Sequence, residues 1–220
     1  ADADVPTYGD LLAALDPLPF DLPADARDRA VHLDPEFATY PYCESDTYGD
    51  EHGVTAGPIS ELQPGDSLYF YATLTRHESP AGVDADAAVD WVAPEWGAYL
   101  IGEFRVAEVL DSDACASLSP ADTKTFASNA HCKRAAVDAK VLVRGSDDSR
   151  LFERAVPLST PDAGATANRL VTELSNDSGK GPWWRRRLWF DAPATETLRA
   201  VVDSGPAADE RVFAADTDRI

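Results

Sequence analysis

Residues 63–74 read Gln63-Pro-Gly-Asp-Ser-Leu-Tyr-Phe-Tyr-Ala-Thr-Leu74, and this stretch decides the class of fold. Proline at its second position and glycine at its third are typical of a type II turn over residues 63–66. The run from Ser67 to Leu74 then has the aromatic content of a buried strand. We therefore predict a tight turn that leads directly into β structure.

Outside this stretch, the pattern of apolar residues predicts a mixture of strands and helices. Strands are expected over three further segments, residues 98–109, 140–144 and 151–157. The last two are joined by a polar turn of hairpin length. Helices are expected over residues 10–15, 119–136 and 166–175, and a short helix or a turn is expected over residues 58–62. Because no alternating βαβ order is visible, we predict an α+β fold: a small, bent mixed sheet or a PUA-like barrel with peripheral helices.

The distribution of proline, charge and apolar residues predicts three parts. Residues 1–57 form an N-terminal Pro/Asp-rich extension and a loop, and residues 58–191 form a PUA-like α+β core. Residues 192–220 form an acidic C-terminal tail that contains one helix. The chain starts at Ala1 and contains no methionine, so we expect either a removed start residue or a piece of a longer protein.

The composition predicts an acidic protein adapted to concentrated salt. The chain carries 39 Asp and Glu against 19 Lys and Arg, a formal net charge of −20 that is spread along the sequence. Such a chain repels itself in dilute buffer, and salt relieves the repulsion by screening. We therefore expect a halophilic, cytoplasmic protein, with an acidic mesophilic protein as the alternative. No apolar run is long enough for a membrane span, and no secretion signal is visible.

One third of the chain departs from this acidic character. Residues 124–190 contain 12 cations and 7 acids, a net charge of +5. A basic region in an otherwise acidic protein predicts an anion site, with nucleic acid or a nucleotide as the ligand. The alternative is that these cations pair with the protein's own carboxylates.

The densest part of the basic region is Gly181-Pro-Trp-Trp-Arg-Arg-Arg-Leu-Trp-Phe190, for which the pattern predicts a strand or a stiff loop. An extended segment would present Trp183, Arg185, Arg187 and Trp189 on one face. Indole rings beside guanidinium groups suit stacking on unpaired or flipped bases. The alternative places the tryptophans in the core and pairs the arginines with acids.

Two other segments contain residues that could take part in chemistry. His32-Leu-Asp-Pro-Glu-Phe37 is typical of a turn with His32 pointing into a pocket. We expect no metal ion there, because no second histidine lies at ligand spacing, and the sequence indicates no other cofactor. Asn129-Ala-His-Cys-Lys-Arg134 falls on the predicted helix 119–136, where neighbouring residues diverge, so a Cys–His nucleophilic pair is disfavoured.

The ordered set of motifs resembles a known family. The motifs are Thr7-Tyr-Gly-Asp-Leu11, His32-x-Asp-Pro-x-Phe37, Thr47-Tyr-Gly-Asp50, Leu62-x-Pro-Gly-Asp-x-Leu-x-Phe-Tyr71, Tyr99-Leu-Ile-Gly-x-Phe-x-Val106, Asn129-x-His131 and Ser149-Arg-Leu-Phe-x-x-Ala-Val-Pro-Leu-Ser159. Together they resemble the nucleotide modification associated domain 3 family, which is similar in character to PUA, ASCH and EVE domains, and the chain looks like a halophilic archaeal member.

This resemblance implies a role in the synthesis or recognition of modified bases in DNA. The matched positions that could form a site are His32, Asp34, Tyr48, Asp50, Asn129, His131 and Arg150. Two departures from the family pattern are the insertion of residues 41–46 and the absence of the family's N-terminal strand and following loop, so we expect a truncated start.

Three functions are consistent with the sequence. The first is a module that binds DNA or a modified nucleotide by aromatic stacking and arginine contacts, through Tyr48, Tyr71, Asn129, Arg134, Arg150, Trp183, Arg185, Arg187 and Trp189. The second is an enzyme acting on a nucleotide or base, with His32 or His131 as general acid or base and Asp34 or Asp50 as its partner. The third is a protein-interaction domain. In that case both faces of residues 181–190, the Trp/Arg segment, are buried or paired.

Overall fold

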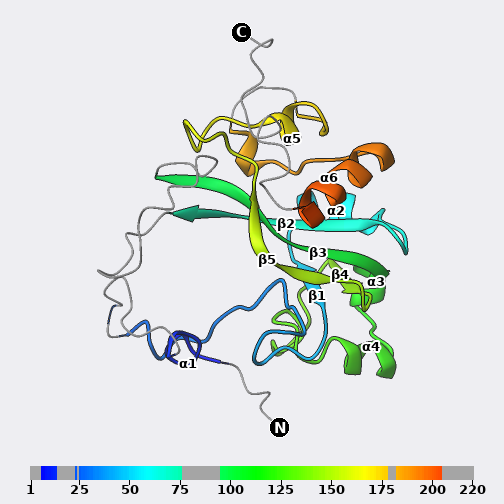
Figure 1. Ribbon diagram of the computed structural model, residues 1–220. Helices are drawn as coiled ribbons and strands as arrows, with labels where there is room; N and C mark the ends of the chain where they lie inside the picture. The colour runs from blue at the N-terminus through cyan, green and yellow to red at the C-terminus, as the bar shows by residue number, and fades with distance from the viewer. Residues whose placement is uncertain (1–5, 14–22, 24, 76–94, 178–181, 205–220) are drawn as a thin grey trace. The chain divides into compact units, whose positions relative to one another are not determined.

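A computed structural model describes residues 6–13, 23, 25–75, 95–177 and 182–204 (Figure 1). In chain order the elements are α1 (Tyr8–Leu12), β1 (Thr47–Asp50), α2 (Gly53–Ser60), β2 (Ser67–Thr75), β3 (Trp96–Leu110), α3 (Ser112–Cys115), α4 (Pro120–Thr125), β4 (Val141–Gly145), β5 (Arg150–Pro157), α5 (Arg169–Thr172), the 3₁₀-helix η1 (Trp183–Arg185) and α6 (Ala192–Ser204).

The strands form one sheet in the order β1-β4-β3-β2, and β5 also pairs with β3. β4 runs antiparallel to β1, with Tyr48 opposite Val143, and antiparallel to β3, with Leu110 opposite Leu142. The register of the β3–β4 pair shifts between Val106 and Glu108. The predicted α+β class is confirmed, as a curled antiparallel sheet with a few helices.

The turn that precedes β2 has the predicted geometry. Gly65 adopts a φ of 95°, and the amide of Asp66 donates to the carbonyl of Gln63 at 3.0 Å, as a type II turn requires. The amide of Val106 then donates to the carbonyl of Asp66 at 2.9 Å, which joins the turn to β3. The expected burial of this strand is wrong, because its residues are half-buried and its last three are exposed.

The expected hairpin between residues 140–144 and 151–157 is also wrong. Both strands are present as β4 and β5, but β4 pairs with β1 and β3, and β5 pairs with β3. The long strand β3 offers enough backbone for both partners. The polar segment between β4 and β5 is held to it, because the amide of Ser146 donates to the carbonyl of Arg105 at 2.7 Å and the Ser149 hydroxyl accepts from the amide of Arg105 at 3.2 Å.

The helix predicted over residues 119–136 is confirmed at its start and wrong beyond residue 125. α4 begins with a capping box, in which the Ser119 side chain and the Asp122 side chain each bind the other residue's amide. It ends at Thr125 because polar side chains that follow it bind other parts of the chain. Ser128 donates to Glu36, and Asn129 donates to Thr47.

Residues 183–190 do not form the extended strand on which the two-face prediction depends. Residues 183–185 form η1, and an isolated bridge pairs Phe190 with Ser175. The Tyr71 hydroxyl lies 3.1 Å from the carbonyl of Trp184 and 3.0 Å from that of Arg186, which occupies groups that a strand would need for pairing. The faces of this segment therefore do not alternate as predicted.

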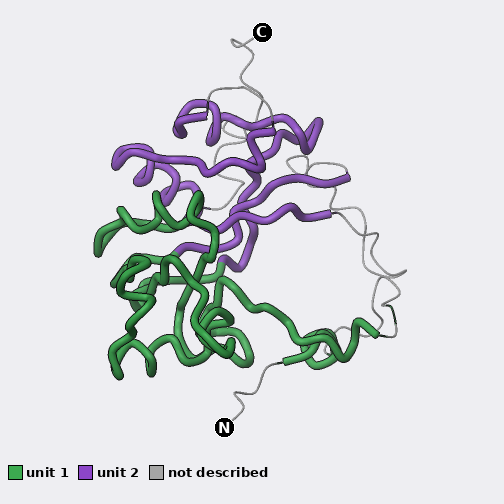
Figure 2. The backbone as a smooth tube through the Cα atoms, turned by 180° about the vertical axis from the view of Figure 1, so that it is seen from behind, with its two compact units in different colours: residues 1–68, 104–151 green, residues 69–103, 152–220 purple. Residues whose placement is uncertain are grey.

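The chain divides into two compact units (Figure 2). Unit 1 consists of residues 1–68 and 104–151, and it includes a buried cluster of Cys115, Phe126, Ala139 and Leu142. Unit 2 consists of residues 69–103 and 152–220, and its core gathers residues from β3, β5, α5 and α6. The three parts predicted from the sequence remain a prediction. In the described ranges, no helix has both the length and the apolar character needed to cross a membrane.

Candidate functional site

A buried glutamate ties the segment after His32 to strand β1 in unit 1. The backbones of Glu36 and Thr47 exchange two hydrogen bonds, at 2.8 and 3.2 Å. The Glu36 carboxylate, which is fully buried, accepts from the Thr47 hydroxyl at 2.7 Å and from the Ser128 hydroxyl at 2.9 Å. This network fixes two distant segments, around residues 36 and 128, on the same strand.

Asn129 continues this network to His131. Its amide nitrogen donates to the Thr47 hydroxyl at 3.1 Å, and its amide oxygen accepts from the backbone N–H of His131 at 3.0 Å. Asn129 is fully buried, so the side chain predicted to bind a ligand positions His131 instead.

Gly49 explains the glycine of the Thr47-Tyr-Gly-Asp50 motif. Its backbone N–H lies 3.1 and 3.3 Å from the two carboxylate oxygens of Asp34. A Cβ atom at this position would lie 2.6 Å from Cδ2 of His131, closer than real Cβ contacts. The glycine therefore orients Asp34 and leaves room for the imidazole.

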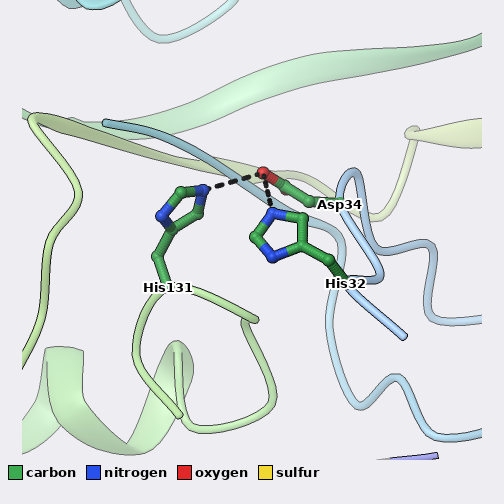
Figure 3. A group of neighbouring side chains, drawn as sticks. All are labelled: His32, Asp34 and His131. Atoms are coloured by element: carbon green, nitrogen blue, oxygen red, sulfur yellow. Dashed lines mark ion pairs between the residues drawn. The ribbon is translucent and has the colours of Figure 1, made fainter. Parts of the chain in front are cut away.

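These supports bring His32, Asp34 and His131 together (Figure 3). Oδ2 of Asp34 lies 3.3 Å from Nε2 of His131 and 3.9 Å from Nε2 of His32. The two imidazole rings are 4.9 Å apart and nearly perpendicular. The side chains of Asp34 and His131 are each 5% exposed, whereas that of His32 is 46% exposed. The cluster is thus buried on one side and accessible at His32.

His131 lies between two carboxylates. Its Nδ1 atom is 2.8 Å from Oδ1 of Asp138, on the side of the ring opposite Asp34. A neutral imidazole has one N–H donor, so it can satisfy only one of these carboxylates. Burial raises the pKa of Asp34, although His131 and Gly49 oppose this by hydrogen bonding, and partial burial lowers the pKa of His32.

Arg134 and Asp50 lie beside the cluster and have partners of their own. The Arg134 guanidinium contacts Asp138 and lies 2.8 Å from Oε2 of Glu51. Asp50 accepts from the Tyr48 hydroxyl at 2.9 Å and from the amide of His52 at 2.6 Å. Burial raises the pKa of Tyr48, and Asp50 raises it further. Of the two carboxylates considered as a partner for histidine, Asp34 is the one that meets His131.

Cys132 follows His131 in the chain, but its thiol is poorly suited to act as a nucleophile. Burial raises the pKa of this thiol to about 11, so little thiolate exists at neutral pH. The pair was disfavoured on the assumption that both residues lie on a helix, whereas α4 ends at Thr125.

A cavity of about 220 Å³ adjoins the cluster, and His32 forms part of its wall. Lys133 and Arg134 also line it, together with Ser128 and a set of apolar residues, Pro6, Ala30, Val31, Leu33 and Ala130. Two cations and one imidazole in the wall favour an anionic ligand. The volume is below the 300–1,000 Å³ or so that encloses a drug-sized molecule, so the cavity suits one portion of a ligand.

Two of the aromatic residues predicted to bind a ligand, Trp183 and Tyr71, make contacts within unit 2. Trp183 is 5% exposed, and its indole N–H donates to the carbonyl of Ala165 at 2.9 Å. Tyr71 holds the backbone of the same segment, as described above. Arg186 pairs with the buried carboxylate of Asp177. These contacts agree with the alternative in which the Trp/Arg segment stabilises the protein.

Other predicted binding residues lie at the surface. Arg185, Arg187 and Trp189 are exposed, and the Trp189 residue is 51% exposed. Arg150 is exposed at the start of β5. Within the basic region, several cations also have acidic partners: Arg134 pairs with Glu51, Arg144 with Glu108, and Arg169 with Glu173. The local excess of positive charge is therefore partly compensated inside each unit.

His32 and His131 were predicted as alternative acids or bases, each with Asp34 or Asp50 as partner, and the structure brings both histidines to Asp34. No metal ion was expected because no second histidine lies near His32 in the sequence, yet the fold places His131 beside it. Asp138 and Gly49 were not predicted as parts of the site. A signal for Gly49 was available, since a glycine between two polar residues of a strand marks a close approach by another group.

Comparison with known proteins identifies the family. The pattern of the nucleotide modification associated domain 3 family matches residues 1–201, and the chain belongs to this family. The family suggests an association with nucleotide modification systems. No curated protein matches the chain. No solved structure matches it either.

Proposed function

We propose that the protein is an enzyme that acts on a nucleotide or a base in a DNA base-modification system, with His32, Asp34 and His131 as its reaction centre. The observation that carries this proposal is the 3.3 Å separation between Asp34 and His131, both almost fully buried and next to His32, which lines a cavity. A histidine and a carboxylate at hydrogen-bond distance can pass a proton to or from a reacting group.

The surroundings of the cluster support a nucleotide as the ligand. His32, Lys133 and Arg134 line the cavity and favour a phosphate group, which would leave the base or sugar near the buried pair. The family's association with nucleotide modification points to the same class of ligand. DNA or a modified nucleotide is therefore the proposed partner.

The proposal is tested by incubating the protein with deoxynucleotides and short single-stranded DNA, with and without modified bases, and following their masses by liquid chromatography and mass spectrometry. We expect the wild type to convert at least one of these compounds. Asp34→Asn, which keeps the size of the side chain, should abolish this conversion, whereas the double variant Arg185→Ala/Arg187→Ala should retain it. Conversion that survives in Asp34→Asn would contradict the proposal, and so would binding at the cavity without any conversion.

A second candidate function is binding of nucleic acid at the exposed part of the Trp/Arg segment. Trp189 and Arg187 are both exposed and lie two residues apart in the chain, and aromatic and cationic side chains together bind unpaired bases by stacking and charge. Loss of oligonucleotide binding in Trp189→Ala, with no effect of Asp34→Asn, would favour this function over the first.

We also propose that the protein works in a salt-rich cytoplasm. The net charge of −20 supports this setting, because self-repulsion is relieved when salt screens it. A melting temperature that rises between 0.1 and about 2 M KCl would agree, since the Debye length falls from about 10 Å to below 3 Å over this range. A melting temperature that is highest in dilute buffer would contradict it.

A further inference from the structure

We infer that His32, Asp34 and His131 bind a divalent transition-metal ion through two imidazole nitrogens and one carboxylate oxygen. This inference deepens the proposed function and rests on it for the ion's role, because it names the cofactor of the same cluster. It does not depend on the identity of the substrate.

The spacing of the three side chains fits such an ion. Their ligand atoms all lie within 4.8 Å of one another. Around a tetrahedral ion with bonds of about 2.0–2.2 Å, neighbouring ligand atoms are roughly 3.3–3.6 Å apart. The 3.3 Å between Asp34 and His131 already matches, and the 3.9 Å between Asp34 and His32 is slightly longer. His32 is the exposed member and has the freedom to close this difference.

The support around His131 is that of a metal ligand. Metal-bound histidines usually donate their other ring N–H to a carboxylate, which fixes the tautomer. Asp138 lies in this position, 2.8 Å from Nδ1. With the proton on Nδ1, the lone pair of Nε2 points toward Asp34, where an anion and a lone pair would otherwise face each other. A cation between them removes this repulsion.

The opposite side of the His131 ring is a poorer site. Glu51, Asp138 and His131 also form a group with suitable spacing. However, the Arg134 guanidinium contacts Asp138 and lies 2.8 Å from Glu51, so these carboxylates already face a positive charge. A metal ion there would be repelled by the guanidinium, which leaves the Asp34 side as the favoured location.

The ligand set also indicates which ions are suitable and what they can do. Two imidazoles and one carboxylate suit zinc or iron(II), whereas magnesium and calcium prefer oxygen ligands alone. Three protein ligands leave at least one coordination position open, as in metal sites that carry out reactions. Because His32 lines the cavity, the open position borders space that a water molecule or a substrate could occupy.

The test uses the full chain after treatment with a chelator. Zinc, cobalt(II) and, without oxygen, iron(II) are titrated at neutral pH by isothermal titration calorimetry, with magnesium for comparison. We expect one transition-metal ion per chain and no comparable binding of magnesium. Asp138→Asn should weaken zinc binding by about 10–100-fold, as loss of a supporting carboxylate does. His32→Gln removes a ligand from an accessible position, so it should fold normally and weaken binding further.

The matched control is His52→Gln, whose side chain is 76% exposed and lies outside the cluster. It should bind zinc like the wild type. Equal affinity of His32→Gln and the wild type would overturn the inference, and so would an absence of transition-metal binding. If no metal binds but Asp34→Asn still abolishes conversion, the metal site fails and the proposed function stands. If zinc binds through these residues and Asp34→Asn leaves conversion unchanged, the proposed function fails and the metal site stands.

Discussion

The two units of the molecule use their charged and aromatic groups in opposite ways. In unit 1, His131 comes from a segment far along the chain from His32 and Asp34, both imidazoles lie within 4 Å of Oδ2 of Asp34, and the cluster is accessible at His32. In unit 2, the dense Trp/Arg segment divides its members between the interior, where Trp183 is buried, and the surface, where Trp189 is exposed. Three side chains that meet in space are therefore better suited to a reaction centre than the many aromatic and basic residues that are merely adjacent in the sequence.

The largest expected effect concerns the histidine between the two carboxylates. His131→Gln removes the imidazole that lies 3.3 Å from Asp34, so we predict a loss of about 10²–10⁴-fold in the rate of conversion. The rate is measured by mass spectrometry on folded protein, with His52→Gln as the control. If this variant folds and keeps the wild-type rate, another region of the protein must carry out the reaction.

The charge pairs of unit 2 should matter for stability and not for conversion. Arg199→Ala removes the guanidinium 3.0 Å from Glu103, a carboxylate that is 2% exposed. We predict a loss of about 3 kcal/mol in the free energy of unfolding, at the lower end for buried pairs because Arg199 is 22% exposed. Urea titration measures this loss, and the rate per folded molecule should not change.

The control for Arg199→Ala uses the second acidic partner of the same arginine. Glu196 also pairs with Arg199, at 2.8 Å, but its own side chain is 74% exposed. Glu196→Gln should therefore cost no more than about 1 kcal/mol. Equal losses in the two variants would mean that burial of Glu103 does not determine the effect.

A pair of glycine substitutions tests whether the approach of His131 to β1 matters. Gly49→Ala places a methyl group 2.6 Å from the His131 ring, so we predict a loss of about 1–3 kcal/mol in stability and a lower rate of conversion. Gly57→Ala in α2 meets no atom within 4 Å apart from its chain neighbours. Alanine is favoured over glycine inside a helix by about 0.5–1 kcal/mol, but Pro58 follows directly and disfavours a helical conformation for a residue with a Cβ. We therefore expect the two effects to offset each other and the stability to change little. Gly49→Ala should shift the melting curve to lower temperature and Gly57→Ala should shift it little, and a shift of Gly49→Ala toward higher temperature would contradict the packing described.

The smallest expected effect is on salt dependence, which distinguishes nucleic-acid binding at the surface of unit 2 from nucleotide binding at the His/Asp cluster. If Arg185 and Arg187 contact phosphates, oligonucleotide affinity falls with salt, and the double alanine variant should reduce the logarithmic slope by about 1.4. Nucleotide binding at the cavity depends on partly buried groups and should respond less to salt. Fluorescence titrations over a range of KCl concentrations measure both. An unchanged slope would show that the two arginines do not contact phosphates of the nucleic acid.

Local features of the fold were predictable because they depend on neighbours in the chain. The turn at Gly65, the cap at Ser119 and the strand that follows Asp66 each result from side chains within a few residues. Predictions failed where distant partners decide the outcome. The helix after Ser119 ends early because Ser128 and Asn129 bind Glu36 and Thr47.

The same reason limits what the sequence reveals about the site. His32 and Asp34 were recognisable as reactive residue types, but their meeting with His131 depends on Gly49 and Asn129, which hold it against β1. The Trp/Arg segment misled because its predicted faces assumed an extended backbone, whereas the Tyr71 hydroxyl binds two of its carbonyls. The composition of a short segment does not reveal which residues from other segments will lie beside it in the fold.

One measurement compares the two regions directly. Histidine ring and tryptophan indole signals can be followed in a single isotope-labelled sample by nuclear magnetic resonance while deoxynucleoside 5′-monophosphates are added. We predict that the signals of His32 and His131 shift at nucleotide concentrations that leave the indole N–H signal of Trp189 unchanged. A shift of the Trp189 signal with unchanged histidine signals would contradict it and would place nucleotide binding on unit 2.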